Sequence, residues 1–227
     1  MDRKMSAVVF DMDGVIFDSE RLILACWEKV GHKYGLAGIR EAALDCTGTN
    51  TTKTKEIMKE RYGEGFPYEE YSKEASVLFH EKIDREGLPL KRGVRELLDY
   101  LREKDIPTAL ASSTRLQVVT EELKQAKLYD YFRVVLGGDQ LKRSKPAPDI
   151  YLTACERLGV NPACAYAVED SYNGIRSAYE AGMMPIMVPD LLAATEEMRE
   201  KSVAVLEDLC RVKDYIVKYQ RIPNSLP

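Results

Sequence analysis

Residues 6–10 read SAVVF, and Asp11-Met12-Asp13-Gly14 follows directly. The run is short, apolar and β-branched, and it ends abruptly at acidic residues, which is typical of a strand buried inside a parallel sheet. In open parallel sheets, ligands bind beyond the carboxyl ends of the strands. The sequence therefore predicts a buried first strand that presents Asp11 and Asp13 at the functional edge of a sheet.

The second half of the chain alternates between strand-like and helix-like segments. Strand character recurs at residues 107–111, 133–136, 165–168, 185–188 and 202–205. Helical patterns follow at residues 115–127, 149–158, 172–180 and 206–219. Such alternation with short loops predicts right-handed crossovers between parallel strands. The expected fold class is therefore α/β, with a doubly wound parallel sheet.

A long helical stretch separates the first strand from the second. Helical patterns cover residues 19–34, 52–62 and 68–85. Glycine and proline interrupt the chain at both ends of this stretch, after Gly14 and at Gly87-Leu88-Pro89. We therefore expect two domains, an α/β core of residues 1–15 and 88–227 and an inserted helical cap of residues 16–87. A cap on two linkers is able to close over a site and exclude water.

Composition and charge argue against nucleic-acid and membrane partners. The chain has 33 basic and 37 acidic residues and a formal net charge of −4, without a long basic run, so we expect no nucleic-acid partner. No apolar run reaches the roughly 18 residues of a membrane helix, and the first one is too short for a signal peptide. The five cysteines form no CxxC pair, which argues against disulfides and zinc. We expect a cytoplasmic monomer without a membrane partner.

Polar residues follow the later strands as well. Ser112 and Ser113 come directly after residues 107–111, and Glu169 and Asp170 come directly after residues 165–168. Between these pairs, Lys145 stands just ahead of a helix. Because the carboxyl ends of parallel strands share one edge of the sheet, these side chains are expected to meet the two aspartates of the first strand.

The predicted cluster holds four acids and a single lysine. Like charges at contact distance oppose each other's ionisation, and a divalent cation removes this conflict. All-oxygen ligands suit Mg²⁺, which prefers to share its coordination shell with a phosphate oxygen. The sequence thus predicts a small phosphorylated metabolite as substrate and Mg²⁺ as cofactor. The expected metal residues are Asp11, Asp13, Glu169 and Asp170, with Asp13 contributing its backbone carbonyl.

Each polar residue has an expected role in phosphoryl transfer. Asp11, at the end of the strand, is the expected nucleophile, because an aspartyl-phosphate splits ester cleavage into two easier displacements. Asp13 lies two residues further and faces the same side if the chain stays extended, so it is the expected general acid and base. The hydroxyl of Ser112, the backbone amides from Ser113 onward and Lys145 are expected to bind the phosphoryl oxygens.

Four segments, in this order, resemble the motifs of the haloacid dehalogenase superfamily: DMDGVIFDSE, ALASST, SKPAPDIY and VEDSYNGIRSAYEAGM. They resemble most closely the branch of the phosphoglycolate phosphatase-like enzymes and β-phosphoglucomutase, which insert a helical cap after the first motif. The resemblance implies a Rossmann-like core and an Mg²⁺-dependent phosphoric monoester hydrolase. It implies these site residues: Asp11 as nucleophile, Asp13 as general acid and base, Ser112 and Lys145 for the phosphoryl group, and Glu169 and Asp170 for Mg²⁺.

The cap bears on which reaction follows. In β-phosphoglucomutase, a histidine in the first cap helix and an arginine in a cap loop stand at the positions of Ile23 and Thr51. That arginine binds the phosphate that is not transferred, so the absence of the arginine here favours hydrolysis. Lys53 or Lys55 could bind this phosphate instead, and a β-phosphoglucomutase-like sugar phosphomutase remains the alternative.

Two further expectations concern the substrate. Gly48, Thr49 and Asn50 form a small polar loop that we expect to contact the hydroxyl groups of the substrate, although a plain surface turn fits the same residues. A non-catalytic protein that binds phosphorylated metabolites is a third candidate, because a fold does not fix a function. Retention of all four acids argues against that candidate.

Overall fold

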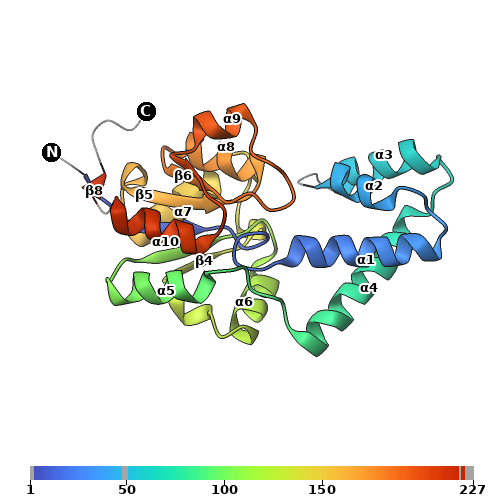
Figure 1. The fold of residues 1–227 in the computed structure, drawn as a ribbon, viewed down its shortest axis with the longest axis horizontal. Helices are drawn as coiled ribbons and strands as arrows, with labels where there is room; N and C mark the ends of the chain where they lie inside the picture. The colour runs from blue at the N-terminus through green and yellow to red at the C-terminus, as the bar shows by residue number, and fades with distance from the viewer. Residues whose placement is uncertain (1–2, 48–50, 220, 223–227) are drawn as a thin grey trace. The chain divides into compact units, whose positions relative to one another are not determined.

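The computed structural model describes residues 3–47, 51–219 and 221–222 (Figure 1). Contacts between Cα atoms divide the chain into two compact units, one formed by Met1–Phe17 with Pro89–Pro227 and the other by Asp18–Leu88. The predicted substrate loop of Gly48, Thr49 and Asn50 lies outside the described residues.

A six-stranded sheet forms the centre of the first unit. Its strands are β2 (Ala7–Phe10), β3 (Thr108–Ala111), β4 (Val134–Leu136), β5 (Ala165–Glu169), β6 (Met184–Met187) and β7 (Ala204–Val205). Their order is β4-β3-β2-β5-β6-β7, and every neighbouring pair is parallel. The strand order reverses at β2, where doubly wound sheets bind their ligands. The predicted α/β fold is confirmed.

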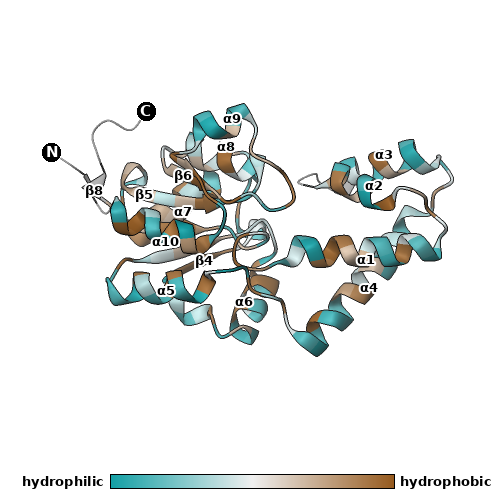
Figure 2. Cartoon of the chain, in the orientation of Figure 1, coloured by the Kyte–Doolittle hydropathy of each residue, from teal (hydrophilic) through white to brown (hydrophobic). Residues whose placement is uncertain are grey.

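Helices cover both faces of this sheet. They are α5 (Val94–Glu103), α6 (Leu116–Gln125), α7 (Asp149–Leu158), α8 (Tyr172–Glu180), α9 (Glu196–Lys201) and α10 (Leu209–Lys218), with short 3-10 turns at Tyr129–Tyr131, Gly138–Gln140 and Pro162–Cys164. Every residue of β2, β3 and β5 is buried, and apart from Thr108, Tyr166 and Glu169 these strands carry apolar side chains (Figure 2). This burial explains why the strands read as continuous apolar runs rather than as alternating ones.

The predicted helices and strands of the sheet unit are present, with ends that differ by up to three residues. Pattern analysis missed α9, which has only six residues. It also missed a small antiparallel pair between β1 (Arg3–Lys4) and β8 (Arg221–Ile222), which joins the two ends of the chain. Segments this short carry no periodicity that would reveal them.

In the described part of the second unit, every regular element is a helix. It comprises α1 (Ser19–Lys33), α2 (Ile39–Cys46), α3 (Thr51–Tyr62) and α4 (Tyr68–Glu86), of which α2 was not predicted. Its core gathers around Tyr71, whose ring meets Trp27 edge-on and whose hydroxyl donates to the Trp27 carbonyl at 2.7 Å. Among the helices described in either unit, none combines the length and the apolar character needed to cross a membrane.

Candidate active site

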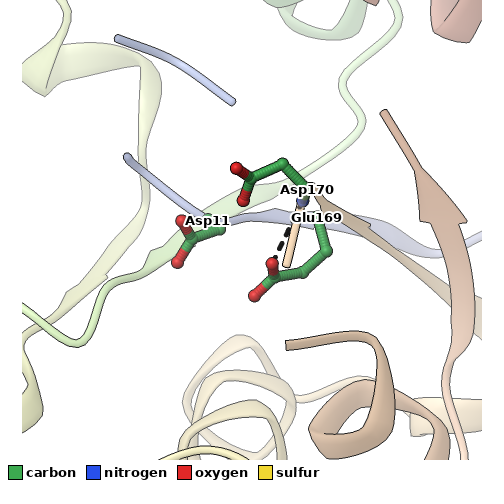
Figure 3. Close-up of side chains that lie close together, drawn as sticks. All are labelled: Asp11, Glu169 and Asp170. Atoms are coloured by element: carbon green, nitrogen blue, oxygen red, sulfur yellow. Dashed lines mark hydrogen bonds between the residues drawn. The ribbon is translucent and has the colours of Figure 1, made fainter. Parts of the chain in front are cut away.

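Three carboxylates converge where β2 and β5 end (Figure 3). β2 and β5 are paired neighbours, and the Asp11 amide after β2 donates to the Val168 carbonyl of β5 at 3.0 Å. This pairing brings Asp11 close to Glu169 and Asp170, and one oxygen of each carboxylate lies within 4.8 Å of the other two. Asp11 and Glu169 are buried. The sheet thus gathers three of the four predicted acids in one place.

Lys145 supplies the positive charge of this cluster. Its ammonium donates to Asp11 Oδ1 at 2.5 Å, to Glu169 Oε1 at 2.6 Å and to the Ala111 carbonyl at 3.0 Å. These contacts use all three donors of the ammonium group. Burial lowers the pKa of Lys145, but the carboxylates of Asp11 and Glu169 outweigh it and raise the pKa above its ordinary range. The side chain is therefore charged.

The two oxygens of Glu169 accept five hydrogen bonds. Oε1 accepts from Lys145 and from the Tyr151 hydroxyl at 2.8 Å. Oε2 accepts from the Asp170 amide at 3.1 Å, drawn as the dashed line in Figure 3, and from the amide and hydroxyl of Ser171 at 3.2 and 3.0 Å. A carboxylate offers about four lone-pair sites. Glu169 is therefore occupied by the protein on both oxygens, despite its proximity to the other acids.

Two glycines make room for these carboxylates. A Cβ on Gly174, in the first turn of α8, would lie 1.8 Å from Glu169 Oε1. Gly14 has a φ of +77°, and a Cβ there would lie 2.0 Å from Asp170 Oδ2. Any side chain at either position would displace an acid, which gives a physical reason for the glycine of Asp-Met-Asp-Gly.

Asp13 is tied to the segment that follows β3. The Thr114 hydroxyl donates to Asp13 Oδ2 at 3.1 Å, and the Thr114 amide donates to the Ser112 hydroxyl at 3.0 Å. Ser112 is fully buried, whereas the side chain of Ser113 is exposed. The predicted serine segment therefore lies beside the Asp11-Asp13 strand end, with Thr114 as its direct contact to Asp13.

Sequence reasoning placed Thr114 in the polar segment after the second strand without giving it a role of its own, and it missed Tyr151. Thr114 belongs to the quoted ALASST segment, and its position two residues after the predicted phosphoryl-binding serine was the available signal. Tyr151 occupies the first turn of α7 and is fully buried. A buried tyrosine hydroxyl needs a hydrogen-bond partner, but sequence periodicity cannot say which one.

The electrostatics of the cluster suit a hard cation. Burial, aided by Glu169 and Asp13, raises the pKa of Asp11 to about 8, against the lowering effect of Lys145. A further cation beside Asp11 would favour the ionised form of this carboxylate. The gathered donors are all carboxylate oxygens, the ligand type that Mg²⁺ prefers. The residues present thus fit the predicted cofactor.

Many α/β enzymes combine a doubly wound sheet with acids at its topological switch point. Similarity to known proteins identifies the family to which this chain belongs. The model of the haloacid dehalogenase-like hydrolases matches residues 8–188, and the chain belongs to this family.

Named relatives agree with the assignment. A phosphorylated carbohydrates phosphatase of Thermotoga maritima is 36% identical over 182 residues, covering 79% of this chain and 82% of the relative. Hexitol phosphatase B of Escherichia coli K12 is 31% identical over 192 residues, covering 82% and 85%. The crystal structure of a β-phosphoglucomutase from Clostridium difficile shares the fold, with a TM-score of 0.71 at 22% identity over 95% and 96% of the two chains. The chain is accordingly a HAD-like phosphoric monoester hydrolase.

Proposed function

We propose that the chain is an Mg²⁺-dependent phosphatase that hydrolyses a small phosphorylated metabolite, a sugar phosphate or a phosphoglycolate-like ester, through an aspartyl-phosphate on Asp11. One observation carries this proposal. Lys145 touches Asp11 directly at the carboxyl edge of the sheet, and Glu169 and Asp170 lie beside them. A nucleophile, a cation for the phosphoryl oxygens and acids for a metal are thus gathered in one cluster.

The first displacement forms the phosphoenzyme. An Asp11 carboxylate oxygen attacks phosphorus, the bond from phosphorus to the ester oxygen breaks, and Asp13 gives its proton to the departing alcohol. Thr114 fixes the Asp13 carboxylate for this task. Lys145 and the segment from Ser112 onward bind the phosphoryl oxygens as their charge moves.

The second displacement releases phosphate. Asp13, now ionised, takes a proton from water, the water oxygen attacks phosphorus, and the bond to Asp11 breaks to regenerate its carboxylate. In this scheme Asp11, Asp170 and the Asp13 carbonyl would hold Mg²⁺, which when bound would neutralise the phosphoryl charge. Because donors already occupy Glu169, we assign it a role outside the direct ligands, through water or through Lys145.

We further propose that the helical unit, Asp18–Leu88, is the cap that selects the substrate. The relatives that act on phosphorylated carbohydrates and hexitol phosphates favour a sugar phosphate or sugar-alcohol phosphate. The phosphomutase stays the second candidate, because a β-phosphoglucomutase has the same fold. Ile23 and Thr51, at the positions of the mutase histidine and arginine, favour hydrolysis.

A panel of phosphorylated metabolites tests this proposal. We expect Mg²⁺-dependent release of inorganic phosphate from p-nitrophenyl phosphate and from at least one sugar phosphate, with loss of release on chelation. Conversion of β-glucose 1-phosphate to glucose 6-phosphate that outpaces phosphate release from every ester would establish the mutase instead. Turnover that a chelator leaves unchanged would contradict the cofactor assignment.

A further inference from the structure

One side chain that sequence reasoning did not select touches both partners of the Lys145–Glu169 ion pair. The Tyr151 hydroxyl donates to Glu169 Oε1 at 2.8 Å, and the Lys145 ammonium lies 5.0 Å from the centre of the Tyr151 ring. Tyr151 is fully buried in the first turn of α7. Tyr151 thus connects helix α7 to the acidic cluster at the end of β5.

Packing alone does not require the hydroxyl. The ring belongs to the core cluster between α7 and the sheet, with Ala109, Ala154 and Ala167 among its members, and a phenylalanine ring would fill the same space. A buried hydroxyl costs free energy unless it is hydrogen-bonded, and here its bond goes to a charged carboxylate.

The Tyr151 hydroxyl affects how the Lys145 ammonium divides its hydrogen bonds between Glu169 and Asp11. Glu169 Oε1 accepts from two donors, while the ammonium divides its three donors among Asp11, Glu169 and the Ala111 carbonyl. Without the hydroxyl, Oε1 would depend on Lys145 alone and would draw the ammonium toward itself. Asp11 would then lose part of its contact with the cation.

We propose that Tyr151 is a positioning residue for phosphoryl binding, whose hydroxyl satisfies Glu169 and so keeps Lys145 placed against Asp11. This inference rests on the proposed function, in which Lys145 binds the phosphoryl oxygens. The residue acts through Lys145 and Glu169, and it touches neither the substrate nor Asp11 in this arrangement.

Two single-hydroxyl deletions test the proposal. Tyr151→Phe removes the hydroxyl that contacts Glu169. Tyr166→Phe is the matched control, because Tyr166 is also fully buried in the core unit and its hydroxyl has no hydrogen-bond partner among the described residues. The measurements are calorimetric binding of inorganic phosphate with Mg²⁺ present, kcat and KM with p-nitrophenyl phosphate, and thermal unfolding.

We expect Tyr151→Phe to weaken phosphate binding and to lower kcat/KM by about tenfold, the usual effect of losing a hydrogen bond to a charged group. Tyr166→Phe should leave both within about twofold, which is smaller than the loss of one such bond. Unchanged phosphate affinity in Tyr151→Phe would overturn the proposal.

A double-mutant cycle with Glu169→Gln keeps the test decisive if Tyr151→Phe also lowers stability. A positioning role through Glu169 predicts that the Tyr151→Phe loss in phosphate affinity shrinks when Glu169→Gln is already present. Losses that add in full would show a packing defect and would contradict the positioning role. Absence of turnover by the unmodified chain would overturn the proposed function itself, and the ratio of phosphate affinities would still decide the role of Tyr151.

Discussion

Asp170 lies where Gly14 leaves space for it. Each residue is constrained by the other: the carboxylate sits where a Cβ would project, and the backbone of Gly14 has the positive φ that glycine adopts freely. This contact is a property of single residues, and it makes the position of a proposed metal ligand depend on the absence of one carbon atom.

Gly14→Ala should therefore disturb the metal site. The new Cβ must displace Asp170, and we expect the Mg²⁺ concentration for half-maximal activity to rise by about 10- to 100-fold, as for other changes that misplace metal ligands. Gly159→Ala is the control, because Gly159 has a similar φ of +70° at the end of α7 but open space around its Cβ.

Both variants should lose about 1–2 kcal/mol of stability from the left-handed backbone, but only Gly14→Ala should change the Mg²⁺ requirement. An unchanged requirement in Gly14→Ala would show that Asp170 does not bind the metal.

At the scale of single residues, sequence reasoning predicted which charged side chains converge, but not which residues support them. Asp11, Lys145 and Glu169 follow or precede recognisable strands and helices, and the fold brings them into direct contact. Tyr151 could not be assigned from the chain, because its role depends on which buried acceptor faces it after the sheet and helices have packed.

Helix α8 links helix stability to the site through its N-cap. The Ser171 hydroxyl accepts from the Gly174 amide at 3.0 Å and also donates to Glu169 Oε2 at 3.0 Å. The N-cap of α10, Asp208, accepts from the Arg211 amide at 3.0 Å and has no part in the proposed site.

Ser171→Ala and Asp208→Ala should consequently differ. Each removes a helix N-cap and should lower the free energy of unfolding by about 1 kcal/mol. Only Ser171→Ala should also reduce kcat/KM, by about tenfold or more, because Glu169 loses a donor. Denaturant unfolding and steady-state kinetics on both variants check this, and equal kinetics in the two would contradict the link between α8 and the site.

Helix α6 carries an acid whose protonation bears on stability. Burial, with the nearby Asp13 and Glu121, raises the pKa of Glu122 to about 7 from an ordinary value of 4.5. Between these two values the folded chain holds a proton that the unfolded chain has released. The contribution of Glu122 to stability therefore declines as pH rises through this window.

Glu122→Gln should remove this decline. The free energy of unfolding of the variant, relative to that of the unmodified chain, should increase between about pH 5 and about pH 8. The increase should be on the order of 1 kcal/mol, because solvent screening weakens the effect at a partly exposed site. Glu103→Gln, at an exposed position of α5 that does not act on Glu122, is the control and should show no such gain. Denaturant unfolding at both pH values measures it. A difference that does not grow with pH would refute the assignment.

Long elements were predictable from the sequence, and short ones were not. Helices α7 and α8 have clear apolar periodicity, and their ends coincide with the predicted ranges, residues 149–158 and 172–180. Helix α2 begins after Gly38, which has a positive φ, and its eight residues are too few for a strong pattern. The β1–β8 pair depends on contact between the two chain ends, which no local pattern encodes.

At the scale of the whole molecule, we propose that the two units have different functions. The core unit holds every residue of the proposed phosphoryl-transfer cluster, whereas substrate choice is assigned to the helical unit. The clustering of charged residues in the core was predictable from the sequence, because side chains that each follow a buried parallel strand meet at one edge of the sheet. In our proposal, selectivity rests on cap residues, and no sequence pattern encodes their contacts with a substrate.

The phosphoenzyme on Asp11 is the central claim for the molecule, and mass spectrometry of the trapped intermediate tests it most directly. The chain is incubated with Mg²⁺ and acetyl phosphate, quenched in acid and digested, with Asp11→Asn and Asp13→Asn treated in parallel. We predict one phosphoryl group on Asp11 in Asp13→Asn, where hydrolysis slows by about 10²- to 10⁴-fold for want of a base, and none in Asp11→Asn. A phosphoryl group on any other residue, or sustained turnover by Asp11→Asn, would contradict the account.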